Sequence, residues 1–181
     1  RLPGLKVFGF YSVGRRQGET WLNLRVLSEQ ESATFFMLDN WGHRDTGSHR
    51  LSILHGINNF TGRADILQGQ ILATEESGNL YGGLYYLSPI TGSVKLQASV
   101  SRNEFEVAGE FAEFGLTGNL VTLAAGLSGT LLDETYGSAS GRLTAAAKKA
   151  VTDSDLFGSI FASTMRYNTL EPSAHLSALN P

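Results

Sequence analysis

The sequence predicts an all-β domain in which an antiparallel meander closes, or nearly closes, into a barrel, with a β-sandwich as the alternative. Three observations support this class. Several runs alternate apolar and polar residues with a period of two, turn-forming residues fill the gaps between these runs, and the chain has 21 glycines against 4 prolines. A short helix near the C-terminus completes the predicted architecture.

The clearest predicted strand is the run from Ser93 to Ser101. Its apolar residues occupy every second position, which places them on one face of a pleated strand: they are Val94, Leu96, Ala98 and Val100. We therefore expect this face to be buried in a core and the opposite face to contact water. The run from Glu104 to Phe114 alternates similarly, and the Arg102-Asn103 pair before it predicts a two-residue hairpin loop.

The remaining strands are predicted from shorter runs bounded by glycine, asparagine or proline. They cover residues 5–13, 20–27, 33–38, 51–57, 60–67, 70–74, 79–88 and 119–125. Because the connections between consecutive runs are mostly short, the strands should pair in chain order. A total of about eight to ten antiparallel strands follows.

After Tyr136 the pattern changes. An alanine-rich stretch with good helix propensity is followed by a run in which Leu156, Ile160, Phe161 and Met165 fall near helical spacing. We predict the short helix here, although this run also alternates as a strand would. Residues 1–167 are predicted to form a single domain, and residues 168–181 an extended C-terminal tail.

Composition and charge exclude several classes of function. The chain of 181 residues has no cysteine, so it contains no disulfide, thiolate metal site or cysteine nucleophile. Its formal net charge is −3, and its basic residues form no stripe of the kind that nucleic acids require. Nucleic acid is therefore not an expected partner.

The sequence also bears on location. No apolar run reaches the length of about 18 residues that a transmembrane helix needs. A transmembrane barrel has alternating strands too, but this chain lacks a continuous aromatic girdle and ends in SALNP rather than in a strand. We therefore predict a protein that does not span a membrane. Because the chain begins with Arg1, we expect a processed product that is extracellular, periplasmic or at the cell surface.

The segment from Asp39 to Arg50 holds the densest group of reactive side chains, and its polar composition predicts a loop. Neutral imidazole is a common ligand of metals and haem iron, so His43 and His49 are candidate metal or haem ligands. The predicted ligand-binding residues are Trp41, His43, His49, Tyr81 and Tyr85, because rings at a barrel mouth can stack on a flat ligand. The plain alternative is a solvated loop with two surface histidines.

The alternating strands with G-x-L and F-x-x-F punctuation resemble the barrels of bacterial surface lipoproteins and haem-scavenging hemophores, and also avidin-like and lipocalin-like barrels. No residue motif of these families is carried over to this chain. The favoured function is a non-enzymatic, exported protein that binds a small-molecule ligand or a protein partner through end loops.

Two other functions stay open. One is a structural subunit of a surface or virion assembly, which would be a homo-oligomer. The other is an enzyme such as a cyclase or isomerase, with Tyr81, Tyr85 and Gln97 among the side chains that line a barrel cavity. The sequence identifies no cofactor.

Overall fold

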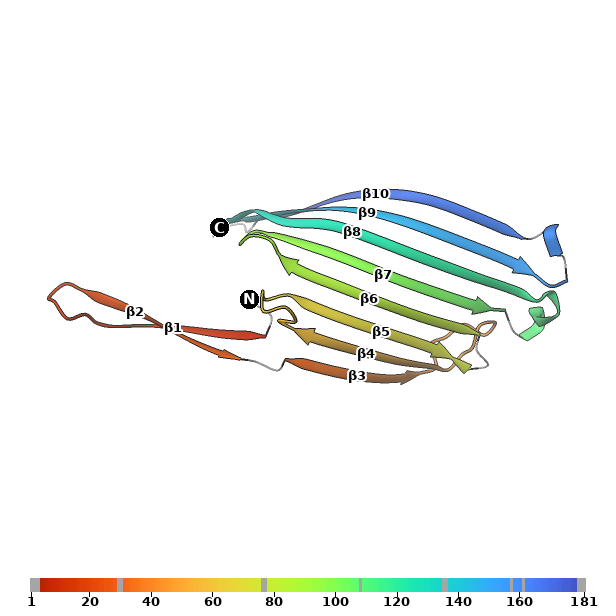
Figure 1. The fold of residues 1–181 in the computed structure, drawn as a ribbon, viewed down its shortest axis with the longest axis horizontal. Helices are drawn as coiled ribbons and strands as arrows, with labels where there is room; N and C mark the ends of the chain where they lie inside the picture. The colour runs from red at the N-terminus through yellow and green to blue at the C-terminus, as the bar shows by residue number, and fades with distance from the viewer. Residues whose placement is uncertain are drawn as a thin grey trace.

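A computed structural model of the chain describes residues 4–28, 31–75, 78–107, 109–134, 137–156, 158–160 and 162–178. These residues form almost only β-strands (Figure 1). The strands are β1 (Leu5–Val13), β2 (Thr20–Ser28), β3 (Ser32–Asp39), β4 (Arg50–Asn58), β5 (Ile66–Thr74), β6 (Asn79–Pro89), β7 (Val94–Glu106), β8 (Leu116–Glu134), β9 (Gly137–Ser154) and β10 (Ser163–Ala178). Short 3-10 helices η2 (Gly109–Phe114) and η3 (Gly158–Ile160) connect the later strands.

The strands form two separate sheets. β3 to β10 make one eight-stranded sheet in which every strand pairs antiparallel with its neighbour in the chain. β1 and β2 form a two-stranded hairpin that extends away from the edge of this sheet at the β3 side (Figure 1). The prediction of an antiparallel all-β meander is therefore confirmed.

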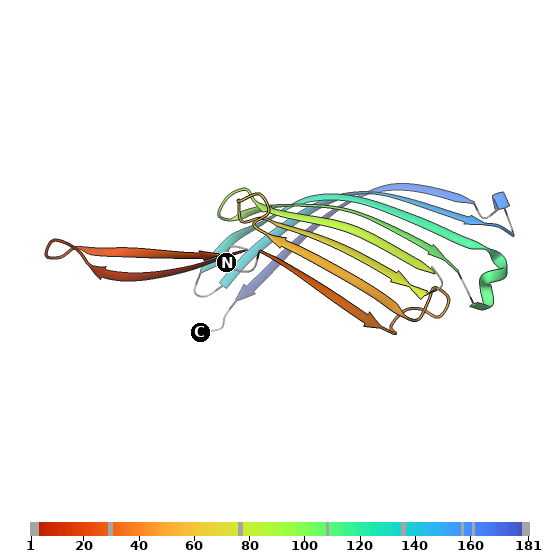
Figure 2. The same ribbon diagram turned by 60° about the horizontal axis from the view of Figure 1, so that its bottom comes forward.

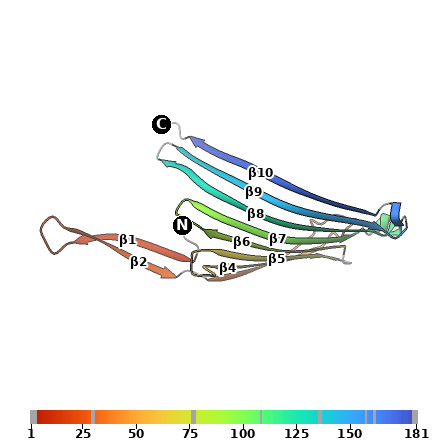
Figure 3. The same ribbon diagram turned by 45° about the horizontal axis from the view of Figure 1, so that its top comes forward.

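The large sheet is curved but stays open. β3 and β10 are its two edge strands, and the views from other sides show an arch rather than a cylinder (Figures 2 and 3). The predicted closure into a barrel is therefore wrong for the described residues, and so is the sandwich, because the two-stranded hairpin extends beyond the sheet. The alternation of side chains predicts strands and their two faces. It does not predict whether the first and last strands pair with each other and close the sheet into a barrel.

The predicted hairpin at Arg102-Asn103 is also wrong. β7 continues through both residues to Glu106, with Arg102 opposite Val121 and Asn103 opposite Leu120 on β8. The reversal comes later, in the connection that contains η2, so the predicted strand from Glu104 to Phe114 is a strand only as far as Glu106. Two polar residues resemble a turn when read alone, but here each one simply occupies a position on one face of a long strand.

The predicted C-terminal helix is a third correction. Its alanine-rich part lies in β9, where Ala145, Ala146 and Ala147 pair with β8 on one side and with β10 on the other. Backbone pairing on both sides outweighs the local helix propensity of alanine. The predicted boundary at residue 167 falls inside β10, while residues 179–181 of the predicted tail lie outside the described residues, and the division into domains stays a prediction.

The strand register divides the large sheet into two faces. Directly opposed residues of antiparallel neighbours lie on the same face, so each face can be followed from strand to strand. What we call the apolar face includes Leu51, Ile53, Leu67, Ile71, Leu80, Leu84, Leu96, Val100, Val121, Leu123, Leu127, Leu143 and Leu170. What we call the polar face includes Gln68, Gln70, Lys95, Gln97, Ser99, Ser101, Thr122, Ser128, Arg142, Thr144, Ser173 and His175.

The apolar face is the more exposed of the two. Along β8, Leu123 is 60% exposed, whereas its neighbours Thr122 and Ala124, on the polar face, are half-buried. Side chains crowd one another on the inner side of a curved sheet, so the polar face is the concave one. No apolar side chain among the described residues is buried, and the predicted buried core is therefore wrong.

Candidate functional site: the two faces of the sheet and the loop between β3 and β4

The apolar face carries a band that runs obliquely across the strands. One register row begins with Phe36, Ile53 and Ile71 on β3 to β5. The same row ends with the charged side chains of Arg102, Lys149 and Arg166 on β7, β9 and β10. On β9 and β10 the apolar residues lie further along, toward Leu143 and Leu176. Such an oblique band arises when tilted strands cross one apolar layer.

On the polar face, side chains hydrogen-bond across the strands. The Gln97 side-chain amide donates to the Thr144 hydroxyl at 3.0 Å, and this bond passes over Gly126 of the intervening strand β8. A Cβ atom at Gly126 would lie 2.8 Å from Gln97 Nε2 and 2.7 Å from the Leu143 carbonyl oxygen. Glycine is therefore required at this position for the two side chains to meet.

Tyr81, Tyr85 and Gln97 all lie on the polar face, as expected of inward positions. Tyr86, next to Tyr85, lies on the opposite face, because successive strand residues alternate. The open sheet surrounds no closed cavity at these residues. Two shallow hollows lie here instead, one of about 290 Å³ lined by Tyr81 and Tyr85 and one of about 270 Å³ lined by Tyr85 and Gln97, and the enzyme hypothesis stays a prediction.

The loop between β3 and β4, residues 40–49, contains three of the predicted site residues. Trp41 is 77% exposed, and its backbone amide donates to Asp39 Oδ1 at 2.9 Å. The Gly42 amide donates to the Ser48 carbonyl at 2.9 Å, which closes the loop on itself. Trp41, His43 and His49 thus lie on a short, internally bonded loop, while Tyr81 and Tyr85 lie in β6.

Glu75, which the sequence did not single out, ties this loop to the end of β5. Its carboxylate accepts hydrogen bonds from the Ser48 amide at 2.9 Å and the His49 amide at 3.3 Å, and pairs with His49 Nδ1 at 2.7 Å. The His49 ring, followed by the His49 and Ser48 amides, lowers the pKa of the Glu75 carboxyl below its usual value. The loop is therefore bound to Glu75 in its ionised form.

Each loop histidine faces a carboxylate through the same ring atom. His43 Nδ1 lies 3.4 Å from Asp45 Oδ2, and His49 Nδ1 lies 2.7 Å from Glu75 Oε2. A carboxylate behind Nδ1 is the usual support of a histidine that binds a metal through Nε2. Within the described ranges, however, no group of three or more potential ligands converges on one point.

His55 lies apart from the loop histidines. It is part of β4 on the apolar face, where its Nδ1 lies 2.8 Å from the Thr34 hydroxyl of β3. The residues that the sequence did not reveal, such as the cations Lys95 and Arg142, come together because the register aligns different strands. Their proximity could have been predicted only from the register between β7, β8 and β9. The wrongly predicted hairpin at Arg102-Asn103 gave the wrong register.

The observed architecture is thus an open, curved antiparallel sheet with an outward apolar face and an inward polar face. Across the described residues, no helix has the length and apolar character needed to cross a membrane. No family model matches the chain.

Over 125 residues, or 68% of its length, the chain is 25% identical to the heme/hemopexin transporter protein HuxB of Haemophilus influenzae strain 86-028NP. It is 24% identical to HuxB of strain ATCC 51907 / DSM 11121 / KW20 / Rd over the same length. In both cases the match spans only 22% of the relative. This is a weak similarity to a segment of a transporter.

Among solved structures, CdiB from Escherichia coli superposes with a TM-score of 0.76 at 17% identity, covering 93% of this chain and 32% of that one. CdiB from Acinetobacter baumannii gives a TM-score of 0.66 at 18% identity, covering 96% of this chain and 34% of that one. At this identity the likeness concerns the fold alone. The fold of this chain therefore matches about a third of a larger structure.

Proposed function

In place of the sequence-based expectation that the protein does not span a membrane, we propose that this chain forms part of the membrane-embedded wall of a transport protein, with its apolar face against lipid chains and its polar face along a water-filled passage. The observation that carries the proposal is the inverted exposure of the sheet. Leu84, Leu123 and Leu170 are 54%, 60% and 66% exposed on the outer face. In water, each exposed Å² of apolar surface costs about 25 cal/mol relative to burial, and lipid would remove that cost.

The lengths of the strands also fit a lipid bilayer. A strand that crosses a bilayer needs about 9 to 11 residues when tilted. β4 and β5 have 9 residues each, and β6 and β7 have 11 and 13. Backbone groups of the inner strands are bonded to neighbouring strands, which is what a bilayer demands.

The open edges give a further reason to regard the chain as part of a larger wall. Unpaired strand edges are not tolerated in hydrocarbon, so β3 and β10 would each need a partner strand. The match to HuxB spans only 22% of that protein, so further strands of a longer protein would close the wall. A cell-surface or outer-membrane location follows from this proposal, and the similarity to a heme/hemopexin transporter supports haem or a haem-carrying protein as the cargo.

Paired single-cysteine variants test the orientation of the faces, because the chain has no natural cysteine. In the intact protein in lipid vesicles, a water-soluble maleimide should label Thr122→Cys and Ala124→Cys quickly. Leu123→Cys and Ala125→Cys should be labelled at least about tenfold more slowly, because lipid excludes the reagent. Equal labelling at all four positions would refute the membrane-embedded sheet. If the apolar face were instead a contact between copies of the chain, the cysteines at positions 123 and 125 would be protected from the maleimide without lipid. This protection would increase with protein concentration.

A second candidate function is binding at the loop of residues 40–49. The supporting observation is that His49 Nδ1 lies 2.7 Å from the Glu75 carboxylate, which leaves the His49 Nε2 atom for an external ligand. His43, whose Nδ1 accepts from the Asp45 amide at 3.3 Å, is a second imidazole of the same loop, and the two would hold haem or a metal ion whose remaining ligands come from water or a partner. Zn²⁺ and haemin titrations should show saturable binding that is lost in His43→Ala and His49→Ala, whereas His55→Ala should bind normally. Unchanged titrations in the first two variants would remove this function.

A further inference from the structure

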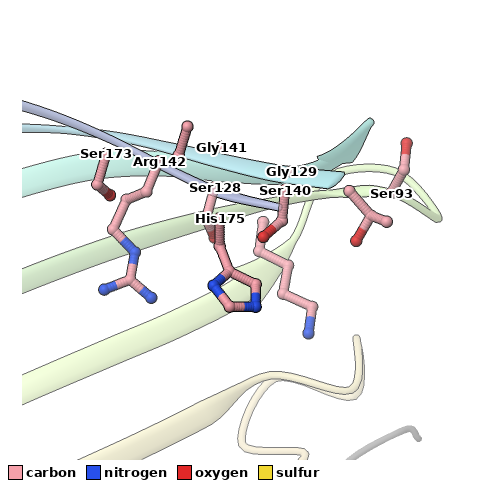
Figure 4. A pocket seen from close by; sticks show the side chains of 11 residues that line it. Ser93, Ser128, Gly129, Ser140, Gly141, Arg142, Ser173 and His175 are labelled. Carbon is pink, nitrogen blue, oxygen red and sulfur yellow. The ribbon is translucent and has the colours of Figure 1, made fainter. Parts of the chain in front are cut away.

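We propose that the polar face contains a binding site for an oxyanion, of which phosphate is the type, formed by Lys95, Arg142 and His175. These three side chains and five serine and threonine side chains line one hollow of about 280 Å³, where β7, β8, β9 and β10 lie side by side (Figure 4). The hydroxyl-bearing residues are Ser93, Ser128, Thr130, Ser140 and Ser173. Neither the proposed transport function nor the loop between β3 and β4 uses this site.

The strand register brings the cations together. Lys95 lies opposite Ser128, Ser128 opposite Arg142, and Arg142 opposite Ser173, which gives one continuous row across four strands. Neighbouring strands are about 4.8 Å apart, so the backbones at Lys95 and Arg142 are about 10 Å apart. Two long side chains on the same face can converge over that distance on one small anion.

His175 extends the site from the next row. It lies opposite Ser140, two residues along β10 from Ser173, so it is a diagonal neighbour of Arg142. Diagonal neighbours on one face are separated by about 7 to 8 Å, within reach of long side chains. Arg142 and His175 extend to the same side of the sheet (Figure 4).

Within the part of the chain that the structure describes, no carboxylate lies within ion-pair distance of these cations. The nearest one on this face by register is Glu171, the other diagonal neighbour of Arg142 on β10. By contrast, the cation Arg50, also on this face, is paired with Asp39 at 2.7 Å. The charges of Lys95 and Arg142 in one hollow repel each other, and an anion between them would relieve this repulsion, with His175 as a further hydrogen-bond donor.

The chemistry of the lining favours a phosphate-type anion. A guanidinium donates two parallel hydrogen bonds to a pair of oxyanion oxygens, and an ammonium acts as a mobile point charge beside them. The hydroxyl groups between the cations can donate to the remaining oxygens. Free phosphate and a phosphate group on a lipid or sugar share this chemistry, so the experiment must separate these sources.

The test is isothermal titration of the intact protein, in dodecyl maltoside micelles and chloride buffer, with inorganic phosphate. We expect saturable binding that weakens at least tenfold in Arg142→Gln and in Lys95→Gln and is partly restored in Arg142→Lys. The matched control is Lys148→Gln, which removes a cation from the same face of β9, outside the hollow; its affinity should stay within twofold of the wild type. Circular dichroism of each variant verifies that the strands are intact.

A second arm uses micelles doped with phosphatidylglycerol in place of inorganic phosphate. Competition between the lipid and inorganic phosphate would indicate that a headgroup phosphate reaches the site, and its absence would identify a free anion as the ligand. The proposal is overturned if inorganic phosphate does not bind, or if Lys148→Gln weakens binding as much as Arg142→Gln. Because phosphate binding does not depend on how the outer face is covered, these outcomes are independent of the cysteine-labelling test.

Discussion

The two faces of the large sheet are made by the same strands, yet they differ in both exposure and chemistry. On β8, Leu123 projects from the convex face and is 60% exposed, while Thr122 and Ala124 project from the concave face and are half-buried. In a water-soluble β protein the apolar side chains would occupy the less exposed face. The comparison shows that a strict period of two says which residues share a face, but not which face is turned inward.

The polar face also shows what holds the open sheet together without a buried core. The bond from Gln97 to Thr144 lies on this side and spans three strands, over a glycine that leaves it space, whereas the bond between Thr34 and His55 on the apolar face joins only adjacent strands. On the apolar face, side chains such as Leu84 and Leu170 project outward without being buried. Changes to the two faces should therefore destabilise the protein through different mechanisms, which two predictions test, and a third concerns the loop between β3 and β4.

The largest expected effect comes from placing a charge on the apolar face. Leu123→Arg should lower the free energy of unfolding from lipid vesicles by about 2–4 kcal/mol, because the guanidinium would have to enter hydrocarbon. Thr122→Arg, one residue away on the polar face, should change it by less than about 1 kcal/mol. Urea titrations followed by the fluorescence of Trp21 and Trp41 measure both values. Equal losses would mean that the two faces share one environment.

A smaller effect is expected on the polar face from filling the space above Gly126. Gly126→Ala should cost about 0.5–1.5 kcal/mol, because its methyl group would lie 2.8 Å from Gln97 Nε2 and 2.7 Å from the Leu143 carbonyl oxygen and would break the half-buried hydrogen bond from Gln97 to Thr144. Gly82→Ala is the matched control on the apolar face, since no atom lies within 4 Å of its Cβ position. The same urea titrations apply, and a loss in Gly82→Ala as large as in Gly126→Ala would contradict this account.

The smallest effect concerns the loop between β3 and β4, outside both faces. Because the folded state lowers the pKa of Glu75, the stabilisation is present above the ordinary carboxyl pKa of about 4.3 and is lost as the pH falls through the lowered value. Amide hydrogen exchange at Ser48 and His49, corrected for intrinsic rates, should therefore speed up in acid. In Glu75→Gln these amides should exchange faster at neutral pH and respond little to acid. Identical profiles in the two proteins would show that Glu75 does not hold the loop.

The sequence predicted the local features of this protein well wherever a pattern of neighbouring residues was enough. The alternation from Val94 to Val100 correctly indicated a strand and the residues that share its face. The loop predicted from Asp39 to Arg50 was also correct apart from its two end residues, which belong to β3 and β4. These features depend on the geometry of a single strand or loop, which the local sequence determines.

The predictions that were wrong concern features that depend on the neighbouring strands in the sheet. The alanines of β9 are good helix formers, and only pairing with β8 and β10 makes them a strand. The turn predicted at Arg102 is absent because β8 is long enough to pair with β7 as far as Glu106. The cluster of Lys95, Arg142 and His175 draws on three strands, so its members are distant in the sequence.

The amino-acid sequence by itself thus determined the pleat, the chemistry of each face and most of the strands, because these follow from covalent geometry and the order of side chains, whereas residues 60–65 of one predicted strand lie in a turn before β5. Only the tertiary structure decided that the sheet stays open, that it curves around its polar side, and that Leu123 faces outward. Curvature and closure are properties of eight paired strands acting together. A period of two is the same whether the apolar side of a strand is turned toward a core or away from it.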